Sequence, residues 1–159
     1  GLRLPSGDKP CQSETMDDTR IEKRVGVQAT SDRIWDLIAD LSGWSAWNPV
    51  DTDVEGAIAY GGRLTMTEAW PDMPERQALA QVVEWQPRMR LVWAERRGFL
   101  FQSLRYIQIE ELGPGNCILT VGIRFSGLRG ELFHDKHRPA IRGALERAAE
   151  GLKSAAEAG

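Results

Sequence analysis

Residues 34–49 of the chain read IWDLIADLSGWSAWNP, and this stretch decides most of what the sequence says about the fold. The apolar residues of its first half recur at helical spacing: Ile34, Trp35, Leu37, Ile38 and Leu41. Thr30 or Ser31 stands where a helix N-cap belongs, and Asp32 suits the positive first turn. The pattern predicts an amphipathic helix.

The second half of the stretch changes character at Gly43, which interrupts the helical pattern. We expect a short helical turn over Trp44–Asn48, ended by Pro49 because proline restricts the residue before it. Asn48 is expected to order this turn. Six tryptophans in a short chain indicate either an aromatic core or a walled pocket for an apolar ligand, and the sequence leaves both open.

Strand patterns lie on both sides of this stretch. The segment Arg20–Val27 alternates imperfectly between apolar and polar residues, as a half-buried strand does. Six more strand-like runs follow, separated by glycine and proline turn signals: Thr52–Glu55, Arg63–Trp70, Leu79–Gln86, Arg90–Arg96, Gln102–Glu111 and Asn116–Phe125. An antiparallel meander is the simplest interpretation.

The period changes to 3.6 near the carboxyl end, where one apolar stripe runs through Glu131–Ala158. This predicts a long terminal helix that covers the sheet. Pro139 is expected to kink the helix or delay its regular part, and Gly143 and Gly151 weaken it further. The buried stripe, not helix propensity, should hold it in place.

Length and composition limit the class of protein. The chain has 159 residues and 42% hydrophobic content, which fits one globular domain, here taken as residues 16–159. Residues 1–15 lack periodicity and are interpreted as a disordered extension or an expression remnant. The charge of −3 is scattered without a basic block, which argues against nucleic acid as a partner.

The cysteines and the hydropathy pattern bear on the compartment. Cys11 and Cys117 lie far apart and outside any C-x-x-C pair, which argues against a disulfide framework and a zinc site. No apolar run approaches the length of a membrane span, and no signal core is present, so we expect a cytoplasmic protein without a transmembrane segment. Phosphate, nucleotide and triad-hydrolase motifs are missing, and we expect no cofactor.

Four short motifs resemble the START and birch-pollen-allergen-like (SRPBCC) superfamily, particularly its bacterial polyketide cyclase/dehydrase-like branch. They are Ile34-Trp-Asp-Leu-Ile-Ala-Asp40, Trp44-x-x-Trp47-Asn48-Pro49, Leu91-Val92-Trp93 and Phe125-Ser-Gly-Leu128. The resemblance implies an α+β helix-grip fold, in which a curved antiparallel sheet of about seven strands wraps a long carboxy-terminal helix, with two short helices after the first strand. It also implies a cavity between sheet and helix; members bind lipids, polyketides or sterols, and a minority catalyse cyclisation or dehydration.

Strand alternation suggests which side chains fill such a cavity. Ile107 and Ile109 on one strand would face inward and bring Arg105 with them. The alternative is a surface arginine after a register slip of one residue. Glu68 shares its parity with Met66 and would be buried with a raised pKa, unless the opposite parity holds. The predicted ligand-binding set is Trp47, Met66, Trp70, Trp93, Arg105, Ile107, Val121, Ile123, Phe125, His137 and Ile141.

Two further features are ambiguous. His134 and His137 are spaced to share one helical face, but zinc needs more ligands than this, so we predict no metal. His137 is either part of a solvated helix start or an acid–base group at the cavity mouth. The apolar tip Phe99–Phe101 is either a lid over the cavity or ordinary hairpin packing.

These observations favour a carrier or sensor that holds a lipid-, polyketide- or aromatic-like molecule, with Arg105 as its polar anchor. The alternative is a cyclase- or dehydratase-like enzyme, in which Arg105 polarises a ketone and Glu68 or His137 moves a proton. A second alternative is a protein-interaction or chaperone-stimulating module. The sequence leaves a homodimer open.

Overall fold

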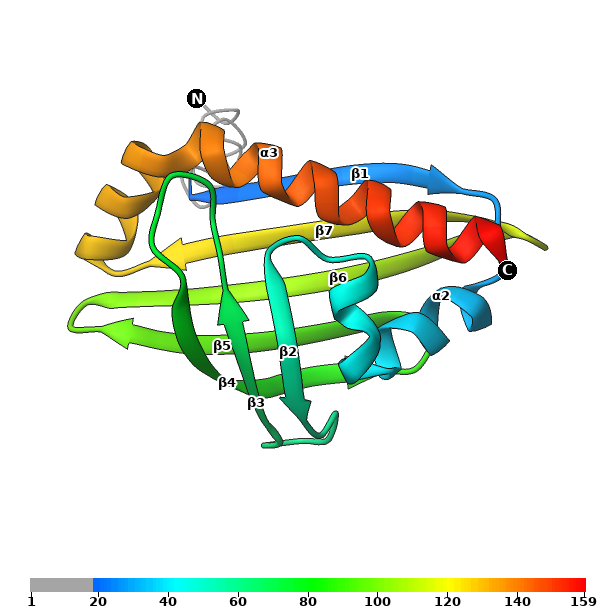
Figure 1. Ribbon diagram of the computed structural model, residues 1–159, viewed down its shortest axis with the longest axis horizontal. Helices are drawn as coiled ribbons and strands as arrows, with labels where there is room; N and C mark the ends of the chain where they lie inside the picture. The colour runs from blue at the N-terminus through cyan, green and yellow to red at the C-terminus, as the bar shows by residue number, and fades with distance from the viewer. Residues whose placement is uncertain (1–18) are drawn as a thin grey trace, which may run out of the picture.

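A computed structural model describes residues 19–159, and its framework is a seven-stranded antiparallel sheet with the order β1-β7-β6-β5-β4-β3-β2 (Figure 1). The strands are β1 Arg20–Val27, β2 Asp51–Gly56, β3 Arg63–Glu68, β4 Arg76–Gln86, β5 Arg90–Gly98, β6 Phe101–Gly113 and β7 Asn116–Ser126. All seven predicted strands are present, with ends that differ by a few residues. Residues 1–15 and Cys11 lie outside the described part.

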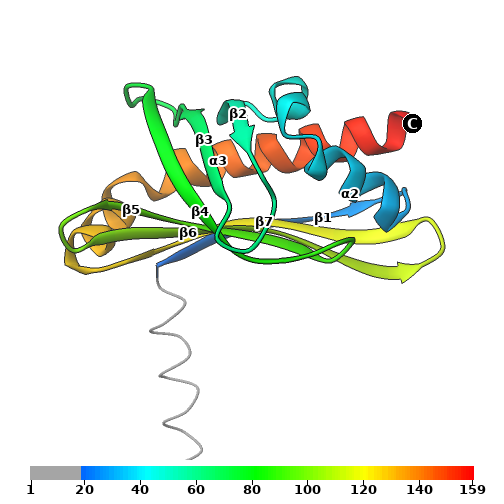
Figure 2. The same cartoon turned by 90° about the horizontal axis from the view of Figure 1, so that it is seen from below.

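The sheet is strongly curved. The strands β2, β3 and β4 rise out of the plane of the other four toward the long helix (Figure 2). A bulge between Val82 and Glu84 interrupts the pairing of β4 with β5, and bulges of this kind bend a strand and increase its twist. The sheet is therefore a curled half-barrel that grips a helix, which confirms the predicted α+β helix-grip fold.

Two short helical segments follow β1. The helix α2 spans Ser31–Ala39, and the Thr30 side chain caps it by accepting a hydrogen bond from the Arg33 N–H at 3.1 Å. The segment η1, Leu41–Ala46, is a 3₁₀ helix. Its Trp44 side chain is fully buried and donates from Nε1 to the Ile38 carbonyl at 2.9 Å. The indole thus ties η1 back to α2.

The helix α3 spans Leu128–Ala158, so it begins three residues before the predicted start and continues through Pro139. It bends in its amino-terminal third, as a proline in a helix interior predicts (Figure 1). Gly151 is required where α3 meets the end of η1, since a Cβ atom there would collide with the Trp47 carbonyl oxygen. The missing side chain thus lets the end of η1 approach the helix closely.

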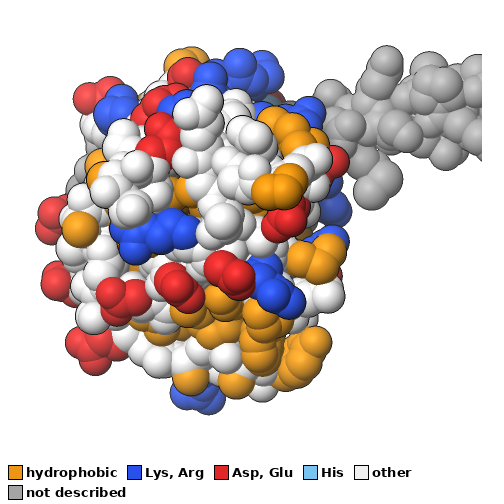
Figure 3. Space-filling model, turned by 90° about the vertical axis from the view of Figure 1, so that its right-hand side faces the viewer, with side chains coloured by type: hydrophobic (Ala, Val, Ile, Leu, Met, Phe, Trp, Pro, Cys, Tyr) orange, Lys and Arg blue, Asp and Glu red, His pale blue; other side chains and the backbone are white. Residues whose placement is uncertain are grey.

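The core lies between the concave face of the sheet and α3. The predicted inward residues of β7 are all buried, and the register pairs Arg105 with Ile123 and Ile107 with Val121 across β6 and β7. Arg105 therefore faces inward, and the register slip is excluded. The end of the molecule where α3 finishes carries scattered charged side chains and one group of apolar side chains at its lower part (Figure 3).

Candidate ligand-binding site

A buried ion pair sits at the centre of the concave face. Arg105 Nη1 lies 2.6 Å from Asp51 Oδ1, and these two residues are 3% and 0% exposed. Burial opposes the charge of Arg105, but the Asp51 and Glu68 carboxylates outweigh it, so the pKa of the guanidinium lies above its ordinary value. The predicted polar anchor is thus already occupied by a carboxylate of the chain itself.

Asn48 positions that carboxylate. Its Oδ1 accepts from the N–H groups of Val50 and Asp51 at 2.8 and 3.0 Å, which is the side-chain turn expected of asparagine here. Its Nδ2 donates to Asp51 Oδ2 at 3.2 Å. The prediction that Asn48 orders the turn at Pro49 is confirmed, and the turn delivers Asp51 to the start of β2.

Tryptophan side chains surround Arg105 in the space between the sheet and α3. The Arg105 guanidinium lies 5.2 Å from the ring centroid of Trp70 and 5.0 Å from that of Trp93, within the range of cation–π interactions. Trp44 contacts both Trp93 and Trp47, with ring centroids 5.5 and 5.4 Å apart. These side chains form an aromatic core beneath α3.

A second cluster of charges continues from Arg105 toward the end of β5. Glu68 is 2% exposed and receives two hydrogen bonds from Arg97, at 2.7 and 3.0 Å. Arg76 Nε and Arg105 Nη1 lie 3.3 and 3.8 Å from its oxygens. Burial alone would raise the pKa of Glu68, but the three guanidinium groups hold it below its ordinary value. The predicted burial is confirmed, and the predicted raised pKa is wrong.

Glu95 completes the cluster. It pairs with Arg76 Nη2 at 2.6 Å to both carboxylate oxygens and lies 3.6 Å from Arg97 Nη2. Ser103 Oγ accepts from Arg97 Nε at 2.9 Å. Three arginines therefore face three carboxylates, and the buried cluster is neutral as a whole.

A pocket of about 460 Å³ opens beside this cluster. It lies between the β3–β4 connection, the ends of β4, β5 and β6, and the first half of α3, and the β3–β4 connection crosses in front of α3 in the view of Figure 1. Its lining combines charged and apolar groups: Glu68, Trp70, Met73, Pro74, Glu75, Arg76, Arg97, Phe101, Phe133 and His137. Aromatic and thioether side chains thus face the polar edge of the ionic cluster.

The β3–β4 connection places the apolar wall of the pocket. Pro71 follows Trp70 directly, and Asp72 has φ 63°, a left-handed conformation that aspartate tolerates better than most residues. Met73 N–H then bonds back to the Trp70 carbonyl at 3.3 Å, which closes the turn. The turn brings Trp70 and Met73 to the same pocket.

Phenylalanine and histidine side chains form the opposite wall. The ring centroids of Phe101 and Phe133 are 5.1 Å apart, and those of Phe133 and His137 are 4.5 Å apart. Phe101 follows directly after the exposed tip Phe99-Leu100. The imidazole of His137 thus joins an aromatic wall at the rim of the pocket.

Of the predicted ligand-binding residues, Trp70 and His137 line this pocket, and Arg105 lies behind it against Trp70 and Glu68. The others are buried in the core, between 0% and 6% exposed, and do not line the pocket: Trp47, Met66, Trp93, Ile107, Val121, Ile123, Phe125 and Ile141. The pocket therefore lies beside the first half of α3, away from the core beneath the middle of the helix.

The sequence-based set missed Arg76, Arg97 and Met73, which line the pocket. For Arg97 the signal was present, because Glu95 and Arg97 continue the inward parity of Leu91 and Trp93 along β5. Arg76 likewise shares the parity of the buried residues of β4. Met73 lies in a connection, where no periodicity could have located it.

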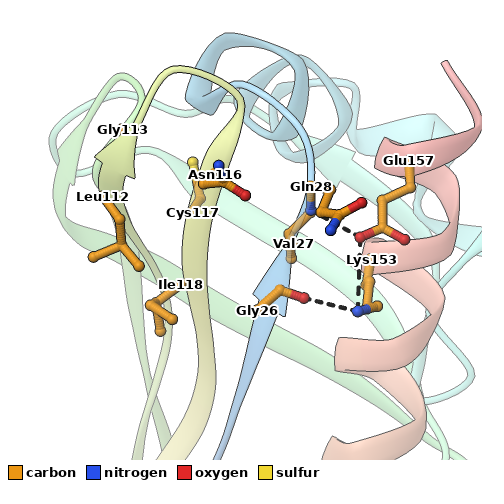
Figure 4. Close-up of a pocket in the computed structure, with 10 residues that line it drawn as sticks. All are labelled: Gly26, Val27, Gln28, Leu112, Gly113, Asn116, Cys117, Ile118, Lys153 and Glu157. Carbon is orange, nitrogen blue, oxygen red and sulfur yellow. Dashed lines mark hydrogen bonds and ion pairs between the residues drawn. The ribbon is translucent and has the colours of Figure 1, made fainter.

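Two other hollows are less suited to an apolar ligand. One of about 600 Å³ lies at the opposite end of α3, where Lys153 donates to the Gly26 carbonyl and Glu157 accepts from the Gln28 N–H, each at 2.8 Å (Figure 4). No aromatic side chain lines it. A groove of about 960 Å³ near the β4–β5 turn is lined mainly by charged and polar side chains. Ligand pockets are usually apolar with few polar groups, which favours the pocket at Trp70.

The chain therefore belongs to the class of helix-grip proteins, whose fold is a ligand-binding fold. The sequence matches the model of the family described as "Polyketide cyclase / dehydrase and lipid transport" over residues 18–157, and the chain belongs to this family. No curated protein matches the chain.

Solved structures with the same fold are distant in sequence. A START superfamily protein from Mycobacterium smegmatis is 18% identical with a TM-score of 0.68, over 87% of this chain and 97% of that one. The di-domain ARO/CYC protein StfQ of the steffimycin biosynthetic pathway is 12% identical with a TM-score of 0.68, over 95% of this chain and 55% of that one. Truncated norcoclaurine synthase from Thalictrum flavum is 16% identical with a TM-score of 0.63, over 85% and 91%.

None of the helices in the described part of the chain has the length and apolarity needed to cross a bilayer. Among the same residues, no three His, Cys, Asp or Glu side chains are grouped as metal ligands would be.

Proposed function

We propose that the protein binds an apolar, ring-containing small molecule in the pocket at Trp70, as a carrier or sensor. The observation that supports this most is the composition of the pocket, in which Trp70, Met73, Phe101 and Phe133 face the buried Arg97–Glu68 pair. Its volume of about 460 Å³ falls within the range of ~300–1,000 Å³ usual for small-molecule sites.

The ionic cluster favours a ligand without a negative charge. An anionic ligand group would find no free counter-ion among the three arginines, because they are paired with three carboxylates of the chain. A carbonyl or phenol could still bond to the edge of Arg76, whose side chain is 37% exposed. A ring compound with one such oxygen suits this wall.

Titration with 1-naphthol, followed by tryptophan fluorescence and calorimetry, tests the proposal. We expect saturable binding at one site. Met73→Trp adds a ring inside the pocket and should weaken binding by about tenfold or more, since a filled pocket cannot accept the ligand without strain. Met89→Trp is the matched control, because Met89 is 42% exposed in the β4–β5 turn and does not line the pocket.

The unfolding temperature of both variants shows whether each is folded. Equal affinity of Met73→Trp and the wild-type protein for 1-naphthol would place the ligand elsewhere. The absence of saturable binding for 1-naphthol, anthraquinone and 1-decanol alike would contradict the proposal itself.

A cyclase- or dehydratase-like activity is the second candidate function. It is favoured by His137, an imidazole that lines the same pocket as the Arg97 guanidinium. Of the three predicted catalytic residues, Arg105 is paired with Asp51 and does not line the pocket, and Glu68 is held ionised by its arginines, so neither is free for its predicted role of polarising a ketone or donating a proton. His137 remains the candidate acid–base group.

Exchange of the α protons of 2-tetralone in heavy water, followed by NMR, examines this second candidate. His137→Gln should lower the protein-dependent exchange rate by about a hundredfold, a much larger change than the loss of 1-naphthol affinity expected from the altered pocket wall. Exchange no faster than in buffer would dismiss the enzymatic role and leave the binding role intact.

A further inference from the structure

The end of the molecule that holds the pocket mouth also carries a group of exposed apolar side chains, which we call the apolar rim: Phe99, Leu100, Leu128 and Leu132. They are 74%, 47%, 61% and 61% exposed. Phe99 and Leu100 form the β5–β6 turn, and the two other leucines lie in the first turns of α3. Figure 1 shows these two segments side by side at one end of the fold.

Backbone hydrogen bonds hold the rim together. The N–H groups of Arg129 and Gly130 both donate to the Leu100 carbonyl, at 3.0 and 3.4 Å. A Cβ atom at Gly127 would collide with the same carbonyl, so the β5–β6 turn and the start of α3 are in close contact. The rim is therefore one surface assembled from two elements.

Leu100 is the least expected residue of the rim. Its φ of 56° is left-handed, a conformation that costs a residue with a Cβ atom and normally selects glycine or asparagine. The position thus combines backbone strain with exposure of a large apolar side chain. Neither feature stabilises the folded protein, and strain of this kind gathers at functional sites.

Cations flank the rim. Arg96 lines a hollow with Phe99 and Leu100, and Arg129 and Lys136 line another with Leu132. All three are exposed, and none of them forms an ion pair with a carboxylate of the described residues. Glu131 and Asp135 are the two carboxylates on this part of α3. Cations therefore outnumber anions here, although the whole chain carries a charge of −3.

The rim adjoins the pocket at Trp70. A smaller hollow of about 240 Å³ between the rim and the pocket is lined by Arg129, Leu132 and Lys136, and it shares Phe101, Phe133 and His137 with the pocket. A surface that docks through the rim would therefore lie directly beside the pocket mouth.

We propose that the apolar rim docks onto an anionic lipid bilayer, with Phe99, Leu100, Leu128 and Leu132 entering the interface and the flanking cations facing lipid phosphates. Protruding aromatic and leucine side chains flanked by arginine and lysine are the combination that binds such interfaces. A second copy of the chain fits less well, because a symmetric contact would bring the same unpaired cations face to face. A protein groove or strand partner also fits less well, since the rim protrudes and offers no free strand edge.

Co-sedimentation with vesicles tests the proposal on the full chain. We expect binding to vesicles of equimolar phosphatidylcholine and phosphatidylglycerol, weaker binding to phosphatidylcholine alone, and loss of the difference at about 1 M salt, where the screening length falls to ~3 Å. The double variant Phe99→Ser, Leu132→Ser should lower the partition coefficient by about tenfold or more. Tyr60→Ser, Leu79→Ser is the matched control, since these residues are 75% and 55% exposed and lie on the β2–β3 connection and β4.

Leu100→Gly separates docking from folding. Glycine relieves the left-handed strain at this position, so the variant should unfold at the same or a higher temperature while its binding to the mixed vesicles decreases. Equal vesicle binding by the rim variant and the wild-type protein would overturn the proposal, as would no binding to mixed vesicles at low salt. Self-association that the rim variant abolishes, measured by light scattering without vesicle binding, would assign the rim to a second copy instead.

The docking proposal is independent of the proposed ligand. Met73→Trp fills the pocket but leaves the rim intact, so it should bind vesicles as the wild-type protein does. Failure of either proposal can therefore be recognised without the other.

Discussion

Replacement of Asp51 by asparagine tests how much the buried ion pair between Asp51 and Arg105 contributes to the stability of the fold. The change keeps the shape of the side chain and removes its charge, so that Arg105 loses its partner at 2.6 Å in a site where Asp51 is fully buried. Removal of one partner of a buried ion pair costs ~3–5 kcal/mol, because the remaining charge is left without compensation. Glu68 still lies 3.8 Å from Arg105, so we expect a value near the lower limit, about 3 kcal/mol.

For a chain of this size each kcal/mol lowers the unfolding temperature by about 2–4 °C, so the expected decrease is about 6–12 °C. Urea unfolding monitored by circular dichroism measures the free energy directly. Asp32→Asn is the matched control, because Asp32 is 72% exposed and 3.7 Å from Arg88 Nη1, and exposed pairs contribute less than about 1 kcal/mol.

A double-mutant cycle identifies the cause of the loss. Asp51→Asn in an Arg105→Met background should cost much less than in the wild-type protein, since no buried charge remains to be left unpaired. An Asp51→Asn cost below about 1 kcal/mol, equal to that of the exposed control, would refute the reasoning that this pair is desolvated.

Two further predictions concern α3 and the acid range. Gly151→Ala should destabilise the protein by ~1–3 kcal/mol in urea unfolding, because the added methyl group would collide with the Trp47 carbonyl oxygen. Gly143→Ala should stabilise it by up to ~1 kcal/mol, because the methyl group there meets only a flexible arginine side chain at 3.6 Å. Equal effects of the two variants on stability would contradict the close approach at Gly151. The folded-state pKa of Glu68 lies below its ordinary value of 4.5, so the unfolded chain binds the proton first and the contribution of Glu68 to stability is lost as the pH falls through the folded pKa. Glu68→Gln should therefore flatten the decrease of unfolding free energy below about pH 4.5, and an unchanged slope would show that this carboxylate is not responsible.

Alternation along strands located much of the site but not its chemistry. It placed Arg105 and Glu68 on the concave face, and both are buried there. It could not show that Asp51 and Arg97 would neutralise them, since these partners come from strands 54 and 29 positions away in the chain. A pKa depends on which charges surround a group, so burial alone gave the wrong direction for Glu68.

The position of the pocket was likewise outside the reach of periodicity. Trp47 and Trp93 were predicted to form the walls of the pocket, yet both side chains pack against Trp44 in the core. The pocket forms instead where a β3–β4 connection reaches α3, and its shape depends on a turn at Asp72 and on a helix that begins near residue 128.

The sequence by itself determined the elements and their order and favoured an inward face for several strands, because helical and strand periods are local and repeat over many residues. The resemblance of its motifs to a known family also predicted that the sheet curves around the last helix. Only the tertiary structure decided which charges meet, where the hollow lies and which apolar side chains remain exposed beside it. These properties depend on distances between elements far apart in the chain, and no local pattern encodes such distances.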